Sequence, residues 1–533
     1  MPPKKRRPEK NTGLLRSSAI VGSMTLLSRV LGLVRDIVIA TTVGASALAD
    51  AFFVAFKIPN FLRRLFAEGA FAQAFVPVLA EVREQGGEQG TQAAVRALID
   101  RVAGVLGGTL IFITVLAIIG APAVAALFAP GFLDDVLKFQ AATEMVRITF
   151  PYLFLISMTG FCGAILNSYG RFAAPAFAPV FLNLSLIAAA LVAAPYFAEP
   201  VYALAWGVLL AGVIQLLFML TALYRIELLP RPLWDTGDPG VRRILKLMVP
   251  ALFGVSVSQI NLLLDTVLAS FLPTGSVSWL YYSDRLIELP LGVFGIAIAT
   301  VILPTLSAHR AAARGKEFTL TIDWAIRMVL LVAVPAAMAL LLLAQPILVT
   351  LFEYGALDTR DVRMASFSLQ AYTLGLVAFM LVKVLAPGYY ARQDMVTPVK
   401  IGIRAMVANM FLNLLFVIPL YLYFDLGHVG LALATACSAW FNAGLLLRGL
   451  LREGVYRVQE GWRRYLLRLL LSTAAMCVVA VWLTPAVAEL RQMHALDRAL
   501  QMALICTGGG LTYLLVQFAL GARMRDLRAP GSA

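Results

Sequence analysis

Long apolar runs, separated by glycine, proline and clusters of charge, make up most of this chain. A helix that crosses a bilayer needs about 20 mostly apolar residues, because every backbone amide must find its partner inside the helix where no water is present. The pattern predicts fourteen such helices and an all-α integral membrane protein. They cover residues 15–43, 48–80, 94–127, 140–168, 173–197, 201–224, 241–271, 276–307, 321–352, 362–390, 396–423, 428–451, 463–486 and 497–521.

The positions of lysine and arginine support this count. Short cytoplasmic loops of membrane proteins are enriched in both residues. With both termini placed in the cytoplasm, the cytoplasmic tails and loops hold 30 basic residues and the outside loops hold 5. One missed helix would exchange the sides of all later loops. The alternation therefore predicts fourteen helices with both ends inside the cell.

Composition excludes a soluble enzyme. Of the 533 residues, 60% are hydrophobic and only 14% are charged, against about 25% charged in a soluble domain. The net charge of +14 would suggest nucleic acid in a soluble protein, but here the excess lies in the cytoplasmic segments and indicates no nucleic-acid partner. The basic, proline-bearing residues 1–14 are predicted to form a disordered cytoplasmic tail, and residues 522–533 a second cytoplasmic tail.

An internal repeat relates the two halves of the chain. The stretch from Asp36 to residues 75–81 parallels the stretch from Asp265 to residues 302–308, and residues 167–175 resemble residues 388–398. The repeat predicts two six-helix lobes, residues 15–225 and 240–452, in parallel orientation around a central cavity. Residues 463–521 stand outside it as two extra helices. The alternative is that apolar helices resemble each other by composition alone.

Charged residues also lie inside the predicted helices. A charge at the middle of a bilayer costs at least ~2.5 kcal/mol, so such side chains should face water, protein or a ligand. Helical spacing places the charges of the first, second and eighth helices on shared faces. The residues concerned are Arg29, Arg35, Asp36, Asp50, Arg63, Arg64, Glu68, Arg285 and Glu288.

Two interpretations of these charges remain open. They can be structural ion pairs that lock helices together. Alternatively, the arginines outnumber the nearby acids and form a basic cavity that expects an anion, and the planar guanidinium suits phosphate. On the second interpretation, the substrate-binding residues are predicted to be Arg29, Arg35, Asp36, Asp50, Arg63, Arg64, Arg285 and Glu288.

A second cluster could hold a monovalent cation. Asp265 lies in the seventh predicted helix, Asn409 and Asn413 lie one turn apart in the eleventh, and Thr435 lies in the twelfth. Their oxygens are suitable cation ligands, although such residues also form plain hydrogen bonds between helices. The four cysteines stand singly and the three histidines are expected in loops. No Walker loop, GxSxG or HExxH motif occurs, so the sequence does not predict an enzyme.

Longer motifs carry a family resemblance. They are SRVLGLVRD at 28–36, KVLAPGYYARQDMVTPVK at 383–400 and the stretches 49–81 and 275–307. Through them the sequence resembles, over nearly its whole length, the MurJ (MviN) family of lipid II flippases, within the multidrug/oligosaccharidyl-lipid/polysaccharide exporter superfamily. The resemblance implies fourteen helices in two lobes, with the two C-terminal helices forming part of a groove for a lipid tail.

The same resemblance implies a function. The cargo would be undecaprenyl-pyrophosphate-linked disaccharide pentapeptide, moved by alternating access from the inner to the outer leaflet of the bacterial cytoplasmic membrane for peptidoglycan synthesis. The positions that match the family's cavity charges are Arg29, Arg35, Asp36, Asp50, Arg63 and Arg285. No cofactor is implied, but a monovalent cation or the membrane potential could drive transport.

Rival functions come from two other classes. One is the export of another lipid-linked glycan or of drugs, although a drug exporter should have an acidic cavity. The other is a non-transporting membrane scaffold for cell wall synthesis enzymes, in which the charges would be static locks. Membrane lipids, and on the scaffold interpretation other cell wall synthesis proteins, are the expected partners.

Overall fold

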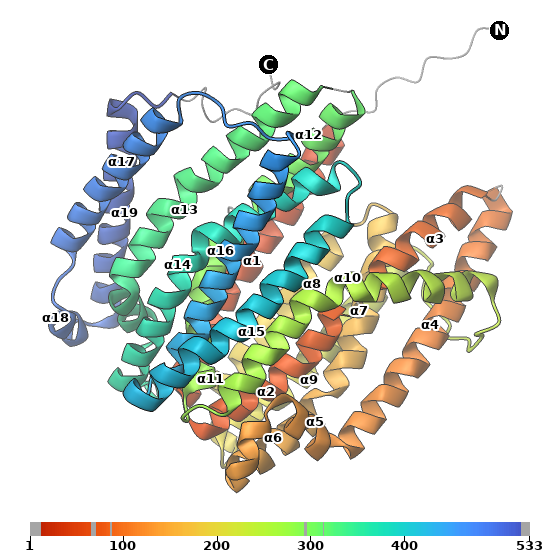
Figure 1. Ribbon diagram of the computed structural model, residues 1–533. Helices are drawn as coiled ribbons and strands as arrows, with labels where there is room; N and C mark the ends of the chain where they lie inside the picture. The colour runs from red at the N-terminus through yellow and green to blue at the C-terminus, as the bar shows by residue number, and fades with distance from the viewer. Residues whose placement is uncertain (1–11, 66–70, 86–87, 293–295, 313, 524–533) are drawn as a thin grey trace. The chain divides into compact units, whose positions relative to one another are not determined.

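The computed structural model describes residues 12–65, 71–85, 88–292, 296–312 and 314–523 (Figure 1). These residues form helices joined by turns and loops, with no strand among them, which confirms the all-α prediction. Most of the predicted tails, residues 1–11 and 524–533, and Glu68 lie outside the described residues.

The helices fall on every predicted segment. In chain order they are α1 (Thr12–Val43), α2 (Ala47–Arg63), α3 (Ala72–Gln85), α4 (Glu88–Ile119), α5 (Ala121–Phe128), α6 (Val136–Thr149), α7 (Pro151–Ser168), α8 (Ala173–Ala188), α9 (Pro200–Tyr224), α10 (Pro239–Ser270), α11 (Ser276–Pro290), α12 (Ile296–Ala311), α13 (Gly315–Phe352), α14 (Thr359–Tyr390), α15 (Val396–Phe424), α16 (Gly427–Arg452), α17 (Trp462–Leu483), α18 (Val487–Gln492) and α19 (Ala495–Ala519). Three short non-α turns are η2 (Pro130–Asp134), η3 (Ala189–Ala193) and η4 (Ala194–Tyr196).

Among the described residues, ten helical segments are long and apolar enough to cross a membrane. The other four predicted crossings correspond to α1, to α2 with α3, to α10 and to α11 with α12. These helices carry most of the charges that the sequence places inside the bilayer, and each is also interrupted by proline or by charge, as at Pro59, Pro250 and Pro290. Each of these features lowers the apolar content of a span or interrupts it.

Contacts divide the chain into two compact units. Unit 1 comprises Met1–Ile39, Ala51–Phe128 and Leu133–Gln259, and unit 2 comprises Ala40–Asp50, Ala129–Phe132 and Ile260–Ala533. The division near residue 260 lies inside α10, whereas the predicted lobes are separated by the linker between residues 225 and 240. Those lobes stay a prediction.

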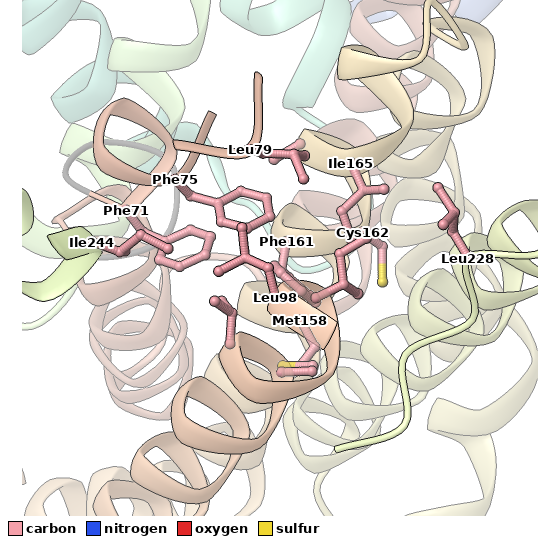
Figure 2. Close-up of a cluster of buried hydrophobic side chains, with 14 of the residues drawn as sticks. Phe71, Phe75, Leu79, Leu98, Met158, Phe161, Cys162, Ile165, Leu228 and Ile244 are labelled. Carbon is pink, nitrogen blue, oxygen red and sulfur yellow. The ribbon is translucent and has the colours of Figure 1, made fainter. Parts of the chain in front are cut away.

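The core of unit 1 is an apolar cluster on α3, α4 and α7 (Figure 2). Phe71 and Phe75 stack with ring centroids 5.2 Å apart, and Phe161 of α7 meets Phe75 at the same distance. Leu228, in the linker before α10, and Ile244 of α10 also belong to the cluster, as do residues of α8 and α9. Aromatic pairs of this kind contribute about 0.5–1.5 kcal/mol beyond the area they bury, so the cluster fixes α3 against its neighbours.

In unit 2, the backbone carbonyls of the short segment 40–50 accept hydrogen bonds from α11 and from the loop before α14. Ala356 donates its N–H to the carbonyl of Thr41 at 2.9 Å, and the Tyr282 hydroxyl donates to the carbonyl of Gly44 at 2.9 Å. Gly44 has a φ of 60°, and a Cβ there would press on the carbonyl of Ala356. Only glycine satisfies both the backbone conformation and this close approach.

The larger part of unit 2 is a bundle of α13, α14, α15 and α16. The two predicted extra helices are α17 and α19, which lie side by side and pack on α13 (Figure 1). Asp323 of α13 fixes the linker before α17. Its carboxylate accepts hydrogen bonds from Tyr456 at 2.7 Å and from Trp462 at 2.8 Å, and it forms an ion pair with Arg327 at 2.7 Å. Burial and the bond to Asp323 raise the pKa of Tyr456 above its ordinary value.

Candidate functional site

Arg35 and Asp36 of α1 form a buried ion pair in unit 1. Their side chains are 9% and 2% exposed, and Asp36 Oδ1 accepts from Arg35 Nε at 2.9 Å and from Nη2 at 2.7 Å. Nη1 of Arg35 donates to Asn183 Oδ1 of α8 at 3.0 Å. The pair is therefore oriented by a neighbouring helix, and its guanidinium already has both a charged and a neutral partner.

Asn183 is a site residue that the sequence prediction missed. Its amide nitrogen donates to the carbonyl of Ser28 at 2.8 Å, so one side chain bonds α1 at two places. Gly32 lies under the Asn183 amide, where a Cβ would be in ordinary contact with it. A lone asparagine in an apolar helix usually bonds across helices. That signal was present in the run VFLNLSLIAAA at 180–190.

The remaining predicted arginines of unit 1 lie nearer the surface. Arg29 and Arg63 are half-buried and Arg64 is exposed. Arg29 lies on α1, Arg63 lies at the last turn of α2 and Arg64 directly follows α2. Their binding of a substrate stays a prediction.

Asp50 caps a helix in unit 2. Its fully buried carboxylate accepts from the backbone N–H of Gly275 at 2.8 Å, from the N–H of Ser278 at 2.9 Å and from the Ser278 hydroxyl at 2.7 Å. These donors lie at the start of α11, where backbone N–H groups have no partner in the helix and the helix dipole favours an anion. The contacts that the structure shows for Asp50 are those of a cap, and its predicted contact with substrate stays a prediction.

Arg285 and Glu288 of α11 form the second predicted pair. Arg285 Nη1 donates to Glu288 Oε2 at 2.7 Å, with the two side chains 29% and 39% exposed. The Arg285 guanidinium also lies over the ring of Tyr281, 4.9 Å from its centroid. The contact with the Tyr281 ring and the hydrogen bond to Glu288 hold the Arg285 guanidinium in a defined orientation. Because the pair is only partly buried, an anion in solvent could compete with Glu288 for it.

The four residues predicted to hold a cation do come together in unit 2. Asn413 Nδ2 donates to Asp265 Oδ1 at 3.0 Å and to Asn409 Oδ1 at 2.9 Å. The Thr435 hydroxyl lies 3.4 Å from Asp265 Oδ2 and 3.5 Å from Asn409 Nδ2. Both asparagines are fully buried, and the buried oxygen Oδ1 of Asn413 has no hydrogen-bond partner among the described residues. This oxygen-rich cluster on α10, α15 and α16 suits a monovalent cation.

The prediction for the histidines was wrong at two positions. His309 lies in α12, which continues past the predicted end of its span at residue 307, and His428 is the second residue of α16, which begins at Gly427. His428 is buried, with Nε2 3.2 Å from the carbonyl of Met364. Within the described ranges, no group of three or more histidine, cysteine, aspartate or glutamate side chains could hold a metal ion.

Comparison with known proteins identifies relatives across almost the whole chain. The family model described as "Lipid II flippase MurJ" matches residues 39–496. A relative from Vibrio cholerae, named "Probable lipid II flippase MurJ", is 49% identical over 523 residues, which is 97% of this chain and 98% of the relative.

Solved structures agree with this. A structure titled "Lipid II flippase MurJ, inward closed conformation" is 26% identical and superposes with a TM-score of 0.78 over 96% of this chain and 99% of its own. An inward-facing multidrug resistance transporter of the MATE family, in the MOP superfamily, has 16% identity and a TM-score of 0.64 over 82% of this chain and 98% of its own. The second likeness shows a common fold only.

Proposed function

Because this chain belongs to the MurJ family of lipid II flippases, we propose that it moves lipid II from the inner to the outer leaflet of the bacterial cytoplasmic membrane, for peptidoglycan synthesis. The observation that carries the proposal is the 49% identity over 97% of the chain, which includes the helices that bear the charged residues. The cargo is the undecaprenyl-pyrophosphate-linked precursor, and the remaining partners are membrane lipids. The chain has no catalytic role in this proposal.

The proposed topology has fourteen membrane crossings with both termini in the cytoplasm. Helices lie on each of the fourteen predicted segments, and the bias of 30 basic residues against 5 favours this orientation. The four crossings beyond the ten apolar ones would be those that carry the charges of α1, α2, α10 and α11. Charged spans of this kind are tolerated where they face protein or a water-filled path instead of lipid.

The arginines Arg29, Arg35 and Arg285 bind the pyrophosphate in this proposal. Guanidinium groups donate two parallel hydrogen bonds to phosphate oxygens. Asp36 and Glu288, each 2.7 Å from its arginine, hold the guanidinium groups in place while no cargo is bound. When cargo arrives, its phosphate oxygens replace these carboxylates as the partners of the arginines. Alternating access of the two repeated halves would then carry the headgroup outward while the lipid tail stays in the bilayer.

The test replaces each of the three arginines with alanine and follows exposure of labelled lipid II in the outer leaflet of vesicles that contain only this protein. Loss of a hydrogen bond to a charged group costs about 1.5–3 kcal/mol, so each variant should flip at least ~10-fold more slowly. Arg147, an exposed arginine on α6, provides the matched control Arg147→Ala. Normal flipping by all three variants would contradict the assignment.

The oxygen cluster supports coupling to a monovalent cation. Asp265, Asn409, Asn413 and Thr435 offer one carboxylate, two amide oxygens and a hydroxyl within one buried cluster. The partnerless oxygen of Asn413 is the observation that favours a bound cation over plain bonding between helices. A cation there would neutralise Asp265 inside the bilayer, where an ionised carboxylate is costly.

The pairing of Arg35 with Asp36 and of Arg285 with Glu288 favours one rival function. In a non-transporting scaffold for cell wall synthesis enzymes, these pairs would be permanent locks. The two functions predict different behaviour of the Arg285→Ala variant. If the chain is a scaffold, cells with this variant should still grow when another protein flips lipid II. If the chain is a flippase, vesicles that contain only the Arg285→Ala variant should not show the flipping signal that the wild type gives.

A further inference from the structure

A cavity of about 270 Å³ lies at one end of unit 2, and none of the residues proposed to bind pyrophosphate lines it. Its wall is formed by the last turn of α12, the first turn of α13, the turn between α14 and α15 and the turn after α16. The lining residues are His309, Arg310, Arg314, Gly315, Phe318, Arg392, Gly454 and Val455. All three connecting turns belong to loops that the charge bias places in the cytoplasm.

The wall of this cavity is basic. Three arginines and one histidine line it, and no acidic residue does. The only carboxylate paired with the lining among the described residues is Glu453, whose Oε2 lies 2.7 Å from Arg392 Nη1. The positive charges of three guanidinium groups around one small space repel one another, and the single carboxylate of Glu453 does not neutralise them. An anion with several acceptor oxygens would neutralise the remaining charge and accept their hydrogen bonds.

Two buried polar atoms of the wall have no hydrogen-bond partner among the described residues. They are Nε2 of His309 and Nη2 of Arg392. Buried donors are rarely left without an acceptor, because they lose their bonds to water and gain none in return. Nη2 of Arg392 is a donor of the kind that a phosphate oxygen accepts from, and Nε2 of His309 is one in the tautomer that carries its proton there.

The start of α13 adds a third feature. Gly315 is its first residue, and no atom lies within 4 Å of the place a Cβ would occupy. The N–H groups at the start of a helix point away from it without partners and favour a nearby anion. An anion in the cavity therefore meets side-chain charge from three elements and the amino end of a 38-residue helix.

The surroundings indicate which anion reaches the cavity. Met395 and Val396 follow Arg392 by a few residues, and Leu451 precedes Gly454; all three apolar side chains are exposed. Apolar side chains beside arginines are typical of the level of lipid headgroups, where the acyl chains and the phosphates each find a partner. Basic pockets on the cytoplasmic side of transmembrane helices bind anionic headgroups.

We propose that this cavity binds the phosphate group of an anionic membrane phospholipid, which joins the ends of α12, α13, α14 and α16 at the cytoplasmic surface. The site does not depend on the flippase function, because none of its residues belongs to the proposed pyrophosphate site or to the oxygen cluster. Free phosphate compounds share the same chemistry, and the test separates the two sources.

The test measures lipid binding to the full-length protein in detergent by native mass spectrometry, with phosphatidylglycerol and phosphatidylcholine as probes. The double variant Arg310→Gln and Arg314→Gln removes two exposed arginines of the wall, so it should fold normally. We expect its apparent Kd for the first phosphatidylglycerol to rise at least ~10-fold, as expected for the loss of charge-assisted bonds, with phosphatidylcholine binding unchanged. The matched control is Arg457→Gln with Arg463→Gln, two exposed arginines outside the cavity, which should keep the wild-type Kd.

Arg392→Lys provides a second variant that keeps the charge and the pairing with Glu453 but loses the guanidinium fork. It should weaken phosphatidylglycerol binding while leaving thermal unfolding without lipid unchanged. Inorganic phosphate is the other arm. Suppose that inorganic phosphate binds to the wild type but not to the Arg310/Arg314 variant, while phosphatidylglycerol binds the two proteins equally. The cavity then binds a soluble phosphate compound, and the lipid as its occupant is ruled out. Equal phosphatidylglycerol affinity in wild type and the Arg310/Arg314 variant, or an equal loss in both double variants, would overturn the proposal.

Discussion

The Asp50 carboxylate ties the first turn of α2 to the start of α11 through three hydrogen bonds. In Asp50→Ala, the N–H groups of Gly275 and Ser278 would be buried without an acceptor. An unsatisfied buried donor costs about 1–3 kcal/mol, so this variant should lower the free energy of unfolding by roughly 2–5 kcal/mol and reduce the thermal unfolding temperature in detergent. Asp50→Asn keeps the shape and one acceptor oxygen, and should lose less.

A second readout separates this cap from a substrate ligand. If Asp50 acts only through α11, the folded fraction of Asp50→Asn should bind lipid II as tightly as the wild type. A clear loss of lipid II binding by a variant that unfolds at the wild-type temperature would restore the predicted contact with substrate.

Other single residues show how far helical spacing carries a prediction. It placed Arg285 within reach of Glu288, because partners three or four residues apart share a helix face. Arg35 and Asp36 are neighbours in the sequence, so their ion pair is not a product of that spacing. The sequence also named Asp265, Asn409, Asn413 and Thr435 by their side-chain oxygens within apolar helices, and the structure joins them by hydrogen bonds. It could not name Asn183 as the partner of Arg35, because the two are 148 residues apart and only the packing of α8 on α1 brings them together.

At the scale of elements, apolar runs located a helix on each predicted segment but not every break, and the short helix α18 (Val487–Gln492) lies outside all of the segments. The segments 48–80 and 276–307 were each predicted as one helix, and the structure divides them into α2 and α3 and into α11 and α12. The segment 140–168 is divided at Pro151, the first residue of α7, since proline is favoured at the first turn of a helix. Hydropathy is insensitive to such breaks because the residues on both sides are apolar.

The docking of the C-terminal helices depends on Asp323. In Asp323→Ala, Arg327 would lose its carboxylate, and Tyr456 and Trp462 would lose their acceptor. Breaking a buried ion pair from one side costs about 3–5 kcal/mol, so the linker 453–461 should become sensitive to limited proteolysis and the thermal unfolding temperature should fall. Lys316→Gln, an exposed change on the same helix, is the control. Unchanged proteolysis in Asp323→Ala would show that apolar contacts alone hold α17 and α19 on α13.

At the scale of the whole molecule, two statistical features of the sequence limited the architecture more than any motif. The charge bias requires an even number of crossings if both termini are cytoplasmic, and the repeat predicts that the first twelve helices form two sets of six. Neither feature specifies which helix borders which, because lipid-facing and protein-facing apolar residues are chemically alike. The tertiary contacts of α17 and α19 with α13, for example, have no counterpart in the sequence pattern.

The energy source for transport is also a property of the whole molecule. A membrane potential of 100 mV, negative inside, is worth about 2.3 kcal/mol for each charge that crosses it. It favours outward movement of an anionic headgroup and inward return of a binding site that has released its cargo and is left cationic. Flipping in vesicles should therefore speed up when a potential of this sign is imposed.

If the cluster around Asp265 couples a cation to this cycle, sodium should matter as well as the potential. Replacing sodium with choline at a fixed potential should slow flipping by the wild type, and Asp265→Asn and Asn413→Ala should remove the difference between the two salts. Sodium should also raise the thermal unfolding temperature of the wild type, since a ligand that binds only the folded state stabilises it, and should do so in neither variant. Glu489→Gln, an exposed carboxylate on α18, should behave as the wild type in both measurements. A sodium response that persists in Asp265→Asn would place any cation site elsewhere and leave the potential on the headgroup as the driving force.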